Sequence, residues 1–221
     1  MIDFAALRRT MVDGQVRTAD VTDLRLLAVM LDLPRERFVP AAKAEFAYLD
    51  RDIPVSGADR PVRWLLKPMV LAKLIQAAAI GETEQVLDVG CATGYSSALL
   101  GRLAGGVVAL EEDMALAQKA TENIAALGAA NVQVAIGALA AGWPAGGPYD
   151  AILLEGASEV VPQALLGQLK EGGRLVCVLG AGPAGKAMLY HARAGEFSGR
   201  PIFNAAAPLL PGFAETPEFV F

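Results

Sequence analysis

The chain has 221 residues, 54% of them hydrophobic, which is enough for one well-buried domain with a small appendage. No apolar run reaches the roughly 20 residues of a membrane span, and a net charge of −5 argues against non-specific nucleic-acid binding. The two cysteines, Cys91 and Cys177, fit no metal-ligand spacing and indicate reduced thiols, and the single His191 excludes an all-histidine metal site. We therefore expect a soluble, cytoplasmic protein with no metal, membrane or nucleic-acid partner. The oligomeric state stays open.

The first 50 or so residues are predicted to be helical. Apolar side chains recur at helical spacing from Phe4 to Met11, and Asp23 is placed to cap the apolar stretch 24–31. Two prolines between residues 34 and 40 then break the pattern, and a further short helix is expected over residues 41–49.

Residues 53–68 are predicted to be an irregular, breaker-rich loop. Its basic and aromatic side chains are Arg60, Arg63, Trp64 and Lys67. The arginines and the lysine are candidates to bind an acidic substrate, because guanidinium groups pair well with carboxylates; a solvated basic loop is an equal alternative. A helix over residues 69–80 then leads into the first strand.

A strand, a glycine-rich turn and a helix start follow one another over residues 86–100. Gly90 and Gly94 allow positive φ and the close approach of a ligand, and the helix start offers unpaired N–H groups. The next apolar run, residues 106–110, ends in Glu111 and Glu112, and Glu111 lies 21 positions after Gly90. At that offset an acid can bind ribose hydroxyls, so this stretch predicts a nucleoside-binding half-fold.

Asp88, two residues before Gly90, discriminates between nucleoside ligands. A carboxylate there would repel the pyrophosphate of a dinucleotide, and the third glycine of that fingerprint is absent. The carboxylate of Asp88 suits the cationic S-adenosylmethionine, which has an ammonium and a sulfonium but no phosphate. The pattern resembles the cofactor motif of Rossmann-like methyltransferases.

Predicted helices and strands alternate along the remainder of the chain. Helices are expected over residues 114–127 and 161–169, and strands over 131–136, 149–155, 174–179 and 186–191. This alternation predicts an α/β fold with a doubly wound, mostly parallel sheet and an N-terminal helical extension. The ligand would then lie at the carboxyl ends of the strands, near Gly90, Glu111, Ala138 and Glu155.

Motifs spread over roughly residues 8 to 180 resemble the protein-L-isoaspartate O-methyltransferase family. They are Met11–Arg17, Val21–Leu27, Pro34–Pro40, Ala47–Tyr48, Val86–Tyr95, Leu127–Val132, Gly142–Pro144, Pro148–Asp150 and Gln168–Val176. The resemblance implies methyl transfer from S-adenosylmethionine, leaving S-adenosylhomocysteine, to the carboxylate of isoaspartyl residues in damaged proteins or peptides. The order of the elements also predicts a division into an N-terminal helical segment with a pocket-covering loop, residues 1–68, and a cofactor-binding core, residues 69–221, within one compact unit.

The resemblance and the motif spacing together suggest the site residues. Cofactor contacts are expected from Asp88, Gly90, Cys91, Ala92, Thr93, Gly94, Tyr95, Glu111, Glu112, Gly137, Ala138, Leu139 and Glu155, and substrate contacts from Trp64, Leu66 and Lys67. No catalytic residue is assigned, because a carboxylate is already a nucleophile and alignment in a dry site suffices.

Three positions depart from the family pattern. Trp64 and Leu66 stand where the family has a threonine and a serine, and Ala138 stands where it has an adenine-binding aspartate. Two alternatives therefore remain: a methyltransferase with a different acceptor, and a protein that binds the cofactor without catalysis. A nicotinamide-dependent oxidoreductase is a third, which Asp88 disfavours.

Overall fold

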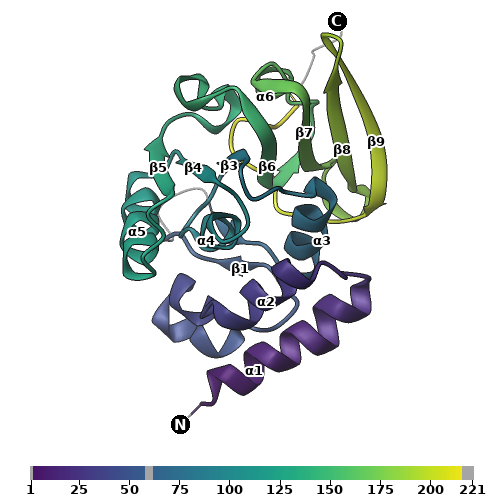
Figure 1. Ribbon diagram of the computed structural model, residues 1–221. Helices are drawn as coiled ribbons and strands as arrows, with labels where there is room; N and C mark the ends of the chain where they lie inside the picture. The colour runs from purple at the N-terminus through teal and green to yellow at the C-terminus, as the bar shows by residue number, and fades with distance from the viewer. Residues whose placement is uncertain (1, 58–61, 216–221) are drawn as a thin grey trace, which may run out of the picture.

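A seven-stranded sheet forms the centre of the computed structural model, which describes residues 2–57 and 62–215 (Figure 1). The strands lie in the order β5-β4-β3-β6-β7-β8-β9. Their bounds are Gln85–Val89 for β3, Gly106–Glu111 for β4, Val132–Ile136 for β5, Tyr149–Ser158 for β6, Leu169–Leu179 for β7, Lys186–Arg193 for β8 and Glu196–Asn204 for β9. The first five in this order are parallel, whereas β8 and β9 are antiparallel to their neighbours.

Helices cover both faces of the sheet, as the alternating pattern predicts. Helices α3 (Pro68–Ala78), α4 (Tyr95–Gly101) and α5 (Met114–Ala126) lie on one face, and the short α6 (Gln163–Leu166) lies on the other (Figure 1). Successive β3 side chains point to opposite faces, so Val86 joins the core beneath the first layer while Leu87 and Val89 join the core beneath α6. The prediction of a doubly wound, mostly parallel sheet is confirmed.

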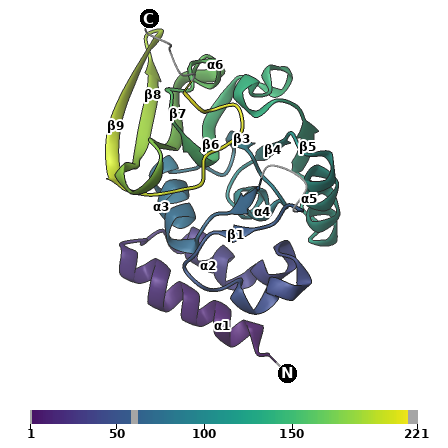
Figure 2. The ribbon, with the colours of Figure 1, turned by 180° about the vertical axis from the view of Figure 1, so that it is seen from behind.

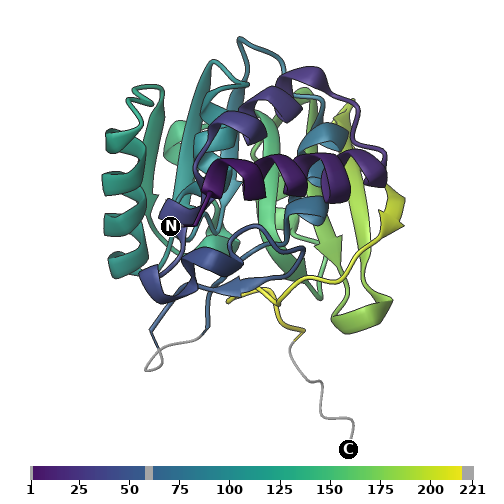
Figure 3. The same ribbon diagram turned by 90° about the horizontal axis from the view of Figure 1, so that it is seen from below.

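The N-terminal segment is helical, as expected. It contains α1 (Phe4–Met11), a π-helical turn at Val12–Val16, 3₁₀ turns at Arg17–Ala19, Arg35–Phe38 and Ala41–Phe46, and α2 (Leu24–Asp32). Asp23 caps α2, since its Oδ1 accepts from the N–H groups of Arg25 and Leu26. Figure 3 shows these purple helices lying across the α3–α4 side of the sheet.

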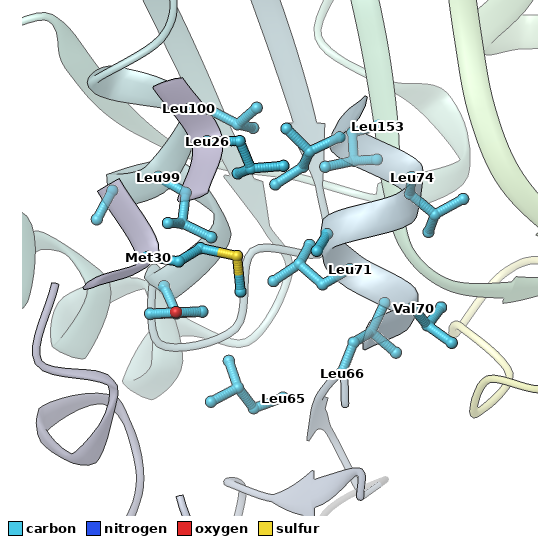
Figure 4. Close-up of a cluster of buried hydrophobic side chains, with 14 of the residues drawn as sticks. Leu26, Met30, Leu65, Leu66, Val70, Leu71, Leu74, Leu99, Leu100 and Leu153 are labelled. Carbon is cyan, nitrogen blue, oxygen red and sulfur yellow. The ribbon is translucent and has the colours of Figure 1, made fainter. Parts of the chain in front are cut away.

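The N-terminal helices share one hydrophobic core with the sheet. Leu26 and Met30 of α2 belong to the same buried cluster as Leu71 of α3, Leu99 of α4 and Leu153 of β6 (Figure 4). Packing is therefore continuous across residue 68, and the division of the chain there stays a prediction.

Two predicted elements were wrong in detail, and one strand was missed. Residues 53–68 are not wholly irregular, because β1 (Ile53–Pro54) pairs with β2 (Trp64–Leu65) across the intervening chain. The helix expected over 161–169 shrinks to α6, because β7 begins at Leu169 and runs through the predicted glycine turn at Gly172. Strand β9 was not predicted, since it is largely exposed and carries Gly199 and Pro201, which weaken a strand pattern.

Arg174 of β7 ties several elements together. Its guanidinium donates to both carboxylate oxygens of Glu84 and to the carbonyls of Ala78, Ala79 and Asp150. It therefore joins the carboxyl end of α3 and the turn before β3 to β6 and β7.

The chain returns to the carboxyl edge of the sheet after β9 (Figure 2). Leu209 forms a parallel bridge with Ala157 of β6, and the N–H of Ala157 donates to the carbonyl of Pro208 at 2.8 Å. Leu210 and Phe213 are buried there against the core on the α6 side. The segment thus covers the edge at which the ligand was expected.

Candidate functional site

The glycine-rich turn between β3 and α4 has the backbone that its sequence predicts. Gly90, Ala92 and Gly94 all have positive φ. A Cβ on Gly94 would come within 3.2 Å of the Cβ of Ala120, and a Cβ on Gly90 would lie 2.8 Å from Nη2 of Arg63. The N–H groups of Gly90 and Cys91 both donate to the carbonyl of Leu110, which ties the turn to the end of β4.

Glu111 is fully buried at the end of β4 and accepts four hydrogen bonds. Its Oε2 accepts from the N–H of Ala92 at 2.8 Å and from Nη2 of Arg63 at 3.0 Å, and its Oε1 accepts from the N–H groups of Glu112 and Asp113. Burial raises the pKa of this carboxyl, which the charge of Arg63 and the three N–H groups oppose. Glu111 therefore joins the turn to the start of α5.

Arg63 is a buried cation that contacts both the glycine turn and Glu111. Its side chain is only 4% exposed, and its Nη2 donates both to Glu111 and to the carbonyl of Gly90, each at 3.0 Å. Its Nη1 is buried without a hydrogen-bond partner. The alternative of a solvated basic loop is wrong for Arg63, because the side chain lies inside the turn; Arg60 lies outside the described residues.

Asp88 lies beneath the turn with one oxygen bonded and one free. Oδ2 accepts from the hydroxyls of Ser96 and Ser97 at 2.7 and 2.5 Å, whereas Oδ1 is buried without a partner. Burial raises the pKa of Asp88 to about 6, against the two hydroxyl donors, and the charge of Glu111 adds to the rise. The serines were expected only as a helix start, and their contact with Asp88 was not predicted.

Glu155 is a second buried acid with an unpartnered oxygen, Oε1. It lies within β6 rather than at its end, since the strand continues to Ser158. Burial and the nearby charge of Asp88 raise its pKa well above the usual range, and the charges of Arg35 and Arg63 oppose the rise. Asp88, Arg35 and Arg63 therefore lie near enough for their charges to act on Glu155.

Sequence reasoning missed Arg35, which is completely buried. Its Nε donates to the carbonyl of Ala47 at 2.7 Å and its Nη2 to the carbonyl of Leu66 at 2.6 Å, while the guanidinium lies 4.6 Å from the ring centroid of Tyr95. Burial lowers its pKa. Tyr95 is thus packed between Arg35 and the edge of Phe38. A buried arginine among helical residues leaves no local signal.

The other residues of the turn have structural contacts. The hydroxyl of Thr93 donates to the carbonyl of Phe38 at 2.6 Å, and Asn123 of α5 donates to the carbonyl of Thr93. Cys91 is buried, and burial raises the pKa of its thiol well above its usual value, which disfavours a nucleophile.

The predicted adenine side lies at the end of β5. The N–H of Gly137 donates to the carbonyl of Glu111 at 3.1 Å, which places this end beside that of β4. Leu139 is fully buried and lies near Gly90, whereas Ala138 and Glu112 are exposed.

The three predicted substrate residues contact residues other than the buried acids. Trp64 pairs with Pro54 in the β1–β2 ladder, and the N–H of Lys67 donates to Asp52 at the start of α3. Leu66 is fully buried, and Figure 4 shows it beside Leu65 and α3 in the core. Their role in substrate binding stays a prediction.

A cavity of about 380 Å³ adjoins the turn. Its wall includes Thr93, the residues around Phe38, the Val55–Gly57 stretch and the first turns of α5. Thr93 is the one predicted cofactor residue in its lining.

Comparisons with known proteins agree on one family. The model of the protein-L-isoaspartate(D-aspartate) O-methyltransferase family matches residues 8–203. A protein-L-isoaspartate O-methyltransferase of Methylorubrum populi is 40% identical over 210 residues, which cover 94% of this chain and 96% of that protein. One of Rhodopseudomonas palustris is 40% identical over 178 residues, which cover 80% and 71% of the two chains.

Solved structures support the fold. A protein-L-isoaspartate O-methyltransferase structure matches with a TM-score of 0.80 at 23% identity, over 93% of this chain and 66% of that one. A Plasmodium falciparum beta-aspartate methyltransferase, solved in complex with S-adenosyl-L-homocysteine, matches with a TM-score of 0.75 at 17% identity, over 95% and 99% of the two chains.

Proposed function

Since the chain belongs to the protein-L-isoaspartate(D-aspartate) O-methyltransferase family, we propose that the turn between β3 and α4, together with Glu111, binds its cofactor. The protein is an S-adenosylmethionine-dependent carboxyl methyltransferase. Its acceptor is the carboxylate of an isoaspartyl residue in a protein or peptide. The family match favours this activity over the nicotinamide-dependent alternative.

The buried polar atoms of the site suit this cofactor. Asp88 Oδ1 and Glu155 Oε1 are acceptors without partners, and a cationic ligand can satisfy both. Gly90 and Gly94 add no side chains of their own to the turn. Glu111 lies at the carboxyl end of β4, where the ribose hydroxyls are expected.

S-adenosylmethionine supplies a sulfonium methyl, which a carboxylate oxygen takes up as the S–C bonding pair passes to sulfur, so no proton is transferred. The chain's part is to align the two reactants and to exclude water. The apolar side chains of Leu210 and Leu139 approach Gly90, and Tyr95, the first residue of α4, is completely buried. No residue is required as a general base.

One observation carries the proposal: the buried acids Asp88 and Glu111 flank a glycine turn held in positive φ at the carboxyl edge of a parallel sheet. The direct experiment offers labelled S-adenosylmethionine and an isoaspartyl peptide, with the matched peptide containing normal aspartate as control. We expect methylation of the isoaspartyl peptide alone. Calorimetry with S-adenosylhomocysteine on the same sample measures cofactor binding. Binding without turnover on either peptide would contradict the assigned acceptor.

We also propose the cytoplasm as the compartment of this protein. Both cysteines are free and buried, which suits a reducing environment. No helix in residues 2–57 and 62–215 is long and apolar enough to cross a membrane.

A further inference from the structure

The hydrogen-bonding capacity of Glu111 is exhausted. A carboxylate offers about four lone-pair positions, and Glu111 uses them on three backbone N–H groups and on Arg63. The N–H groups belong to the glycine turn and to the start of α5, so the fold fixes them. A ribose hydroxyl that binds Glu111 must therefore displace the side chain of Arg63.

Arg63 also occupies the space above the turn. A Cβ built on Gly90 would lie 2.8 Å from its Nη2, and the same nitrogen donates to the Gly90 carbonyl. The cofactor and the guanidinium thus compete for one place as well as for one carboxylate. Arg63 is held by its backbone to the β1–β2 region, where its N–H donates to Ser56 Oγ and its carbonyl accepts from Val55.

After the cofactor displaces it from Glu111, Arg63 offers a positive charge with which the carboxylate of the methyl acceptor can pair. Asp88 and Glu111 are buried acids of this site, and their negative charges oppose the entry of another carboxylate. Arg35 also has a buried Nη1 without a partner, but its position is fixed, because its other two nitrogens donate to backbone carbonyls and its plane packs on Tyr95. Arg63 already has a buried nitrogen, Nη1, with no partner. An arginine is well suited to pair with a carboxylate.

We propose that Arg63 binds the carboxylate of the methyl acceptor, and that it is held on Glu111 until the cofactor ribose displaces it. The cofactor then binds first and prepares the acceptor site. One carboxylate oxygen pairs with the guanidinium and the other attacks the methyl group. This inference rests on the proposed function, since it requires a carboxylate acceptor.

The test compares Arg63→Gln and Arg63→Lys with wild type. Binding of S-adenosylhomocysteine and of an isoaspartyl peptide is measured by calorimetry, separately and together, and KM for the peptide is measured in turnover. Arg9→Gln, on the exposed face of α1, is the matched control. Thermal melts of all variants confirm that each is folded.

We expect Arg63→Gln to bind S-adenosylhomocysteine at least as tightly as wild type, because a competitor for Glu111 is gone. Its KM for the peptide should rise at least tenfold. The KM of Arg63→Lys should fall between those of wild type and Arg63→Gln. Wild type should bind the peptide at least tenfold more tightly when S-adenosylhomocysteine is present, and Arg63→Gln should lose this dependence. Glu111→Gln, which releases Arg63, should bind the peptide without S-adenosylhomocysteine.

Two results would overturn the inference. Weaker S-adenosylhomocysteine binding in Arg63→Gln at unchanged peptide KM would make Arg63 part of the cofactor site. Unchanged values for both ligands would remove it from either site. Failure of wild type to methylate the isoaspartyl peptide would instead overturn the assigned acceptor, so the two failures are distinct.

Discussion

At the scale of single residues, the site is notable for its buried ionisable side chains. Asp88, Glu111 and Glu155 are each at most 5% exposed, and Arg63 and Arg35 are the cations set against them. Burial of a carboxyl oxygen without a hydrogen-bond partner costs stability, and the cost is larger when the carboxyl is ionised. The free oxygens of Asp88 and Glu155 therefore represent stability given up for ligand binding.

Asp88→Asn tests the cost of burying this carboxylate, because the difference in stability between the variant and wild type should depend on pH. The pKa of Asp88 is raised from 3.8 to about 6 in the folded chain, so its contribution to stability is complete below pH 3.8 and is lost as the pH rises through 6. At pH 8 the ligand-free variant should be more stable than wild type by on the order of 1–3 kcal/mol. Near pH 4 the difference should vanish. Urea unfolding at the two pH values measures it.

The same substitution should weaken S-adenosylhomocysteine binding, because a neutral amide attracts the ligand's ammonium less than a carboxylate does. A variant that is less stable than wild type at pH 8 would contradict the account. It would mean that the hydroxyl bonds of Ser96 and Ser97 outweigh the cost of burial.

Local spacing was enough to predict some of these residues. Gly90, Gly94 and Glu111 follow from a strand, a turn and the offset to the next strand end. Arg63 and Arg35 could not be placed in the same way, because their contacts depend on tertiary packing: Arg63 lies 27 residues from Gly90 and 48 from Glu111. The burial of Leu66 in the core likewise depends on tertiary packing, and its predicted role in substrate binding stays a prediction.

At the scale of elements, the position of the site depends on how α3 meets the sheet. Asp50 and Asp52 accept from the N–H groups of Met69 and Lys67 and so cap α3 from outside the helix. At the other end Arg174 binds the carbonyls of Ala78 and Ala79. Helix α3 is thereby held between the β1–β2 segment, which carries Arg63, and the strand β7.

Arg174→Met should lose about 3–5 kcal/mol of stability, because it leaves Glu84 and several carbonyls without a donor. The stability of Arg174→Lys should fall between those of wild type and Arg174→Met, since an ammonium cannot pair with both oxygens of Glu84 at the same geometry. Chemical denaturation measures the free energy of unfolding. Arg200→Met, on exposed β9, is the control and should stay within about 0.5 kcal/mol of wild type. A loss below 1 kcal/mol in Arg174→Met would show that this junction is not critical.

Strands buried on both faces were easier to predict than the others. Continuous apolar runs indicated β3, β4 and β6, whose residues are almost all buried. The pairing of β1 with β2 and the course of β9 depend instead on contacts between distant segments, and their sequences contain breakers. The return of residues 205–213 to the carboxyl edge had no sequence signal at all.

At the scale of the whole molecule, cofactor binding should be visible as a change in stability. A ligand at 100 times its Kd adds about 2.7 kcal/mol to a folded protein that alone binds it. For a chain of this length that shifts Tm by roughly 5–10 °C. We expect this shift with S-adenosylhomocysteine and none with NAD at the same concentration. An equal shift with NAD would contradict the assigned cofactor.

Strand β9 bears on how this protein behaves at high concentration. As an outermost strand of the sheet it has backbone groups that another chain could pair with. Pro201 has no N–H to donate, Gly199 has no side chain to pack against a neighbour, and the register with β8 shifts between Ala187 and Met188. Strand β9 is thus a poor template for fibril growth. An enzyme for damaged proteins has, in its own outermost strand, some protection against aggregation.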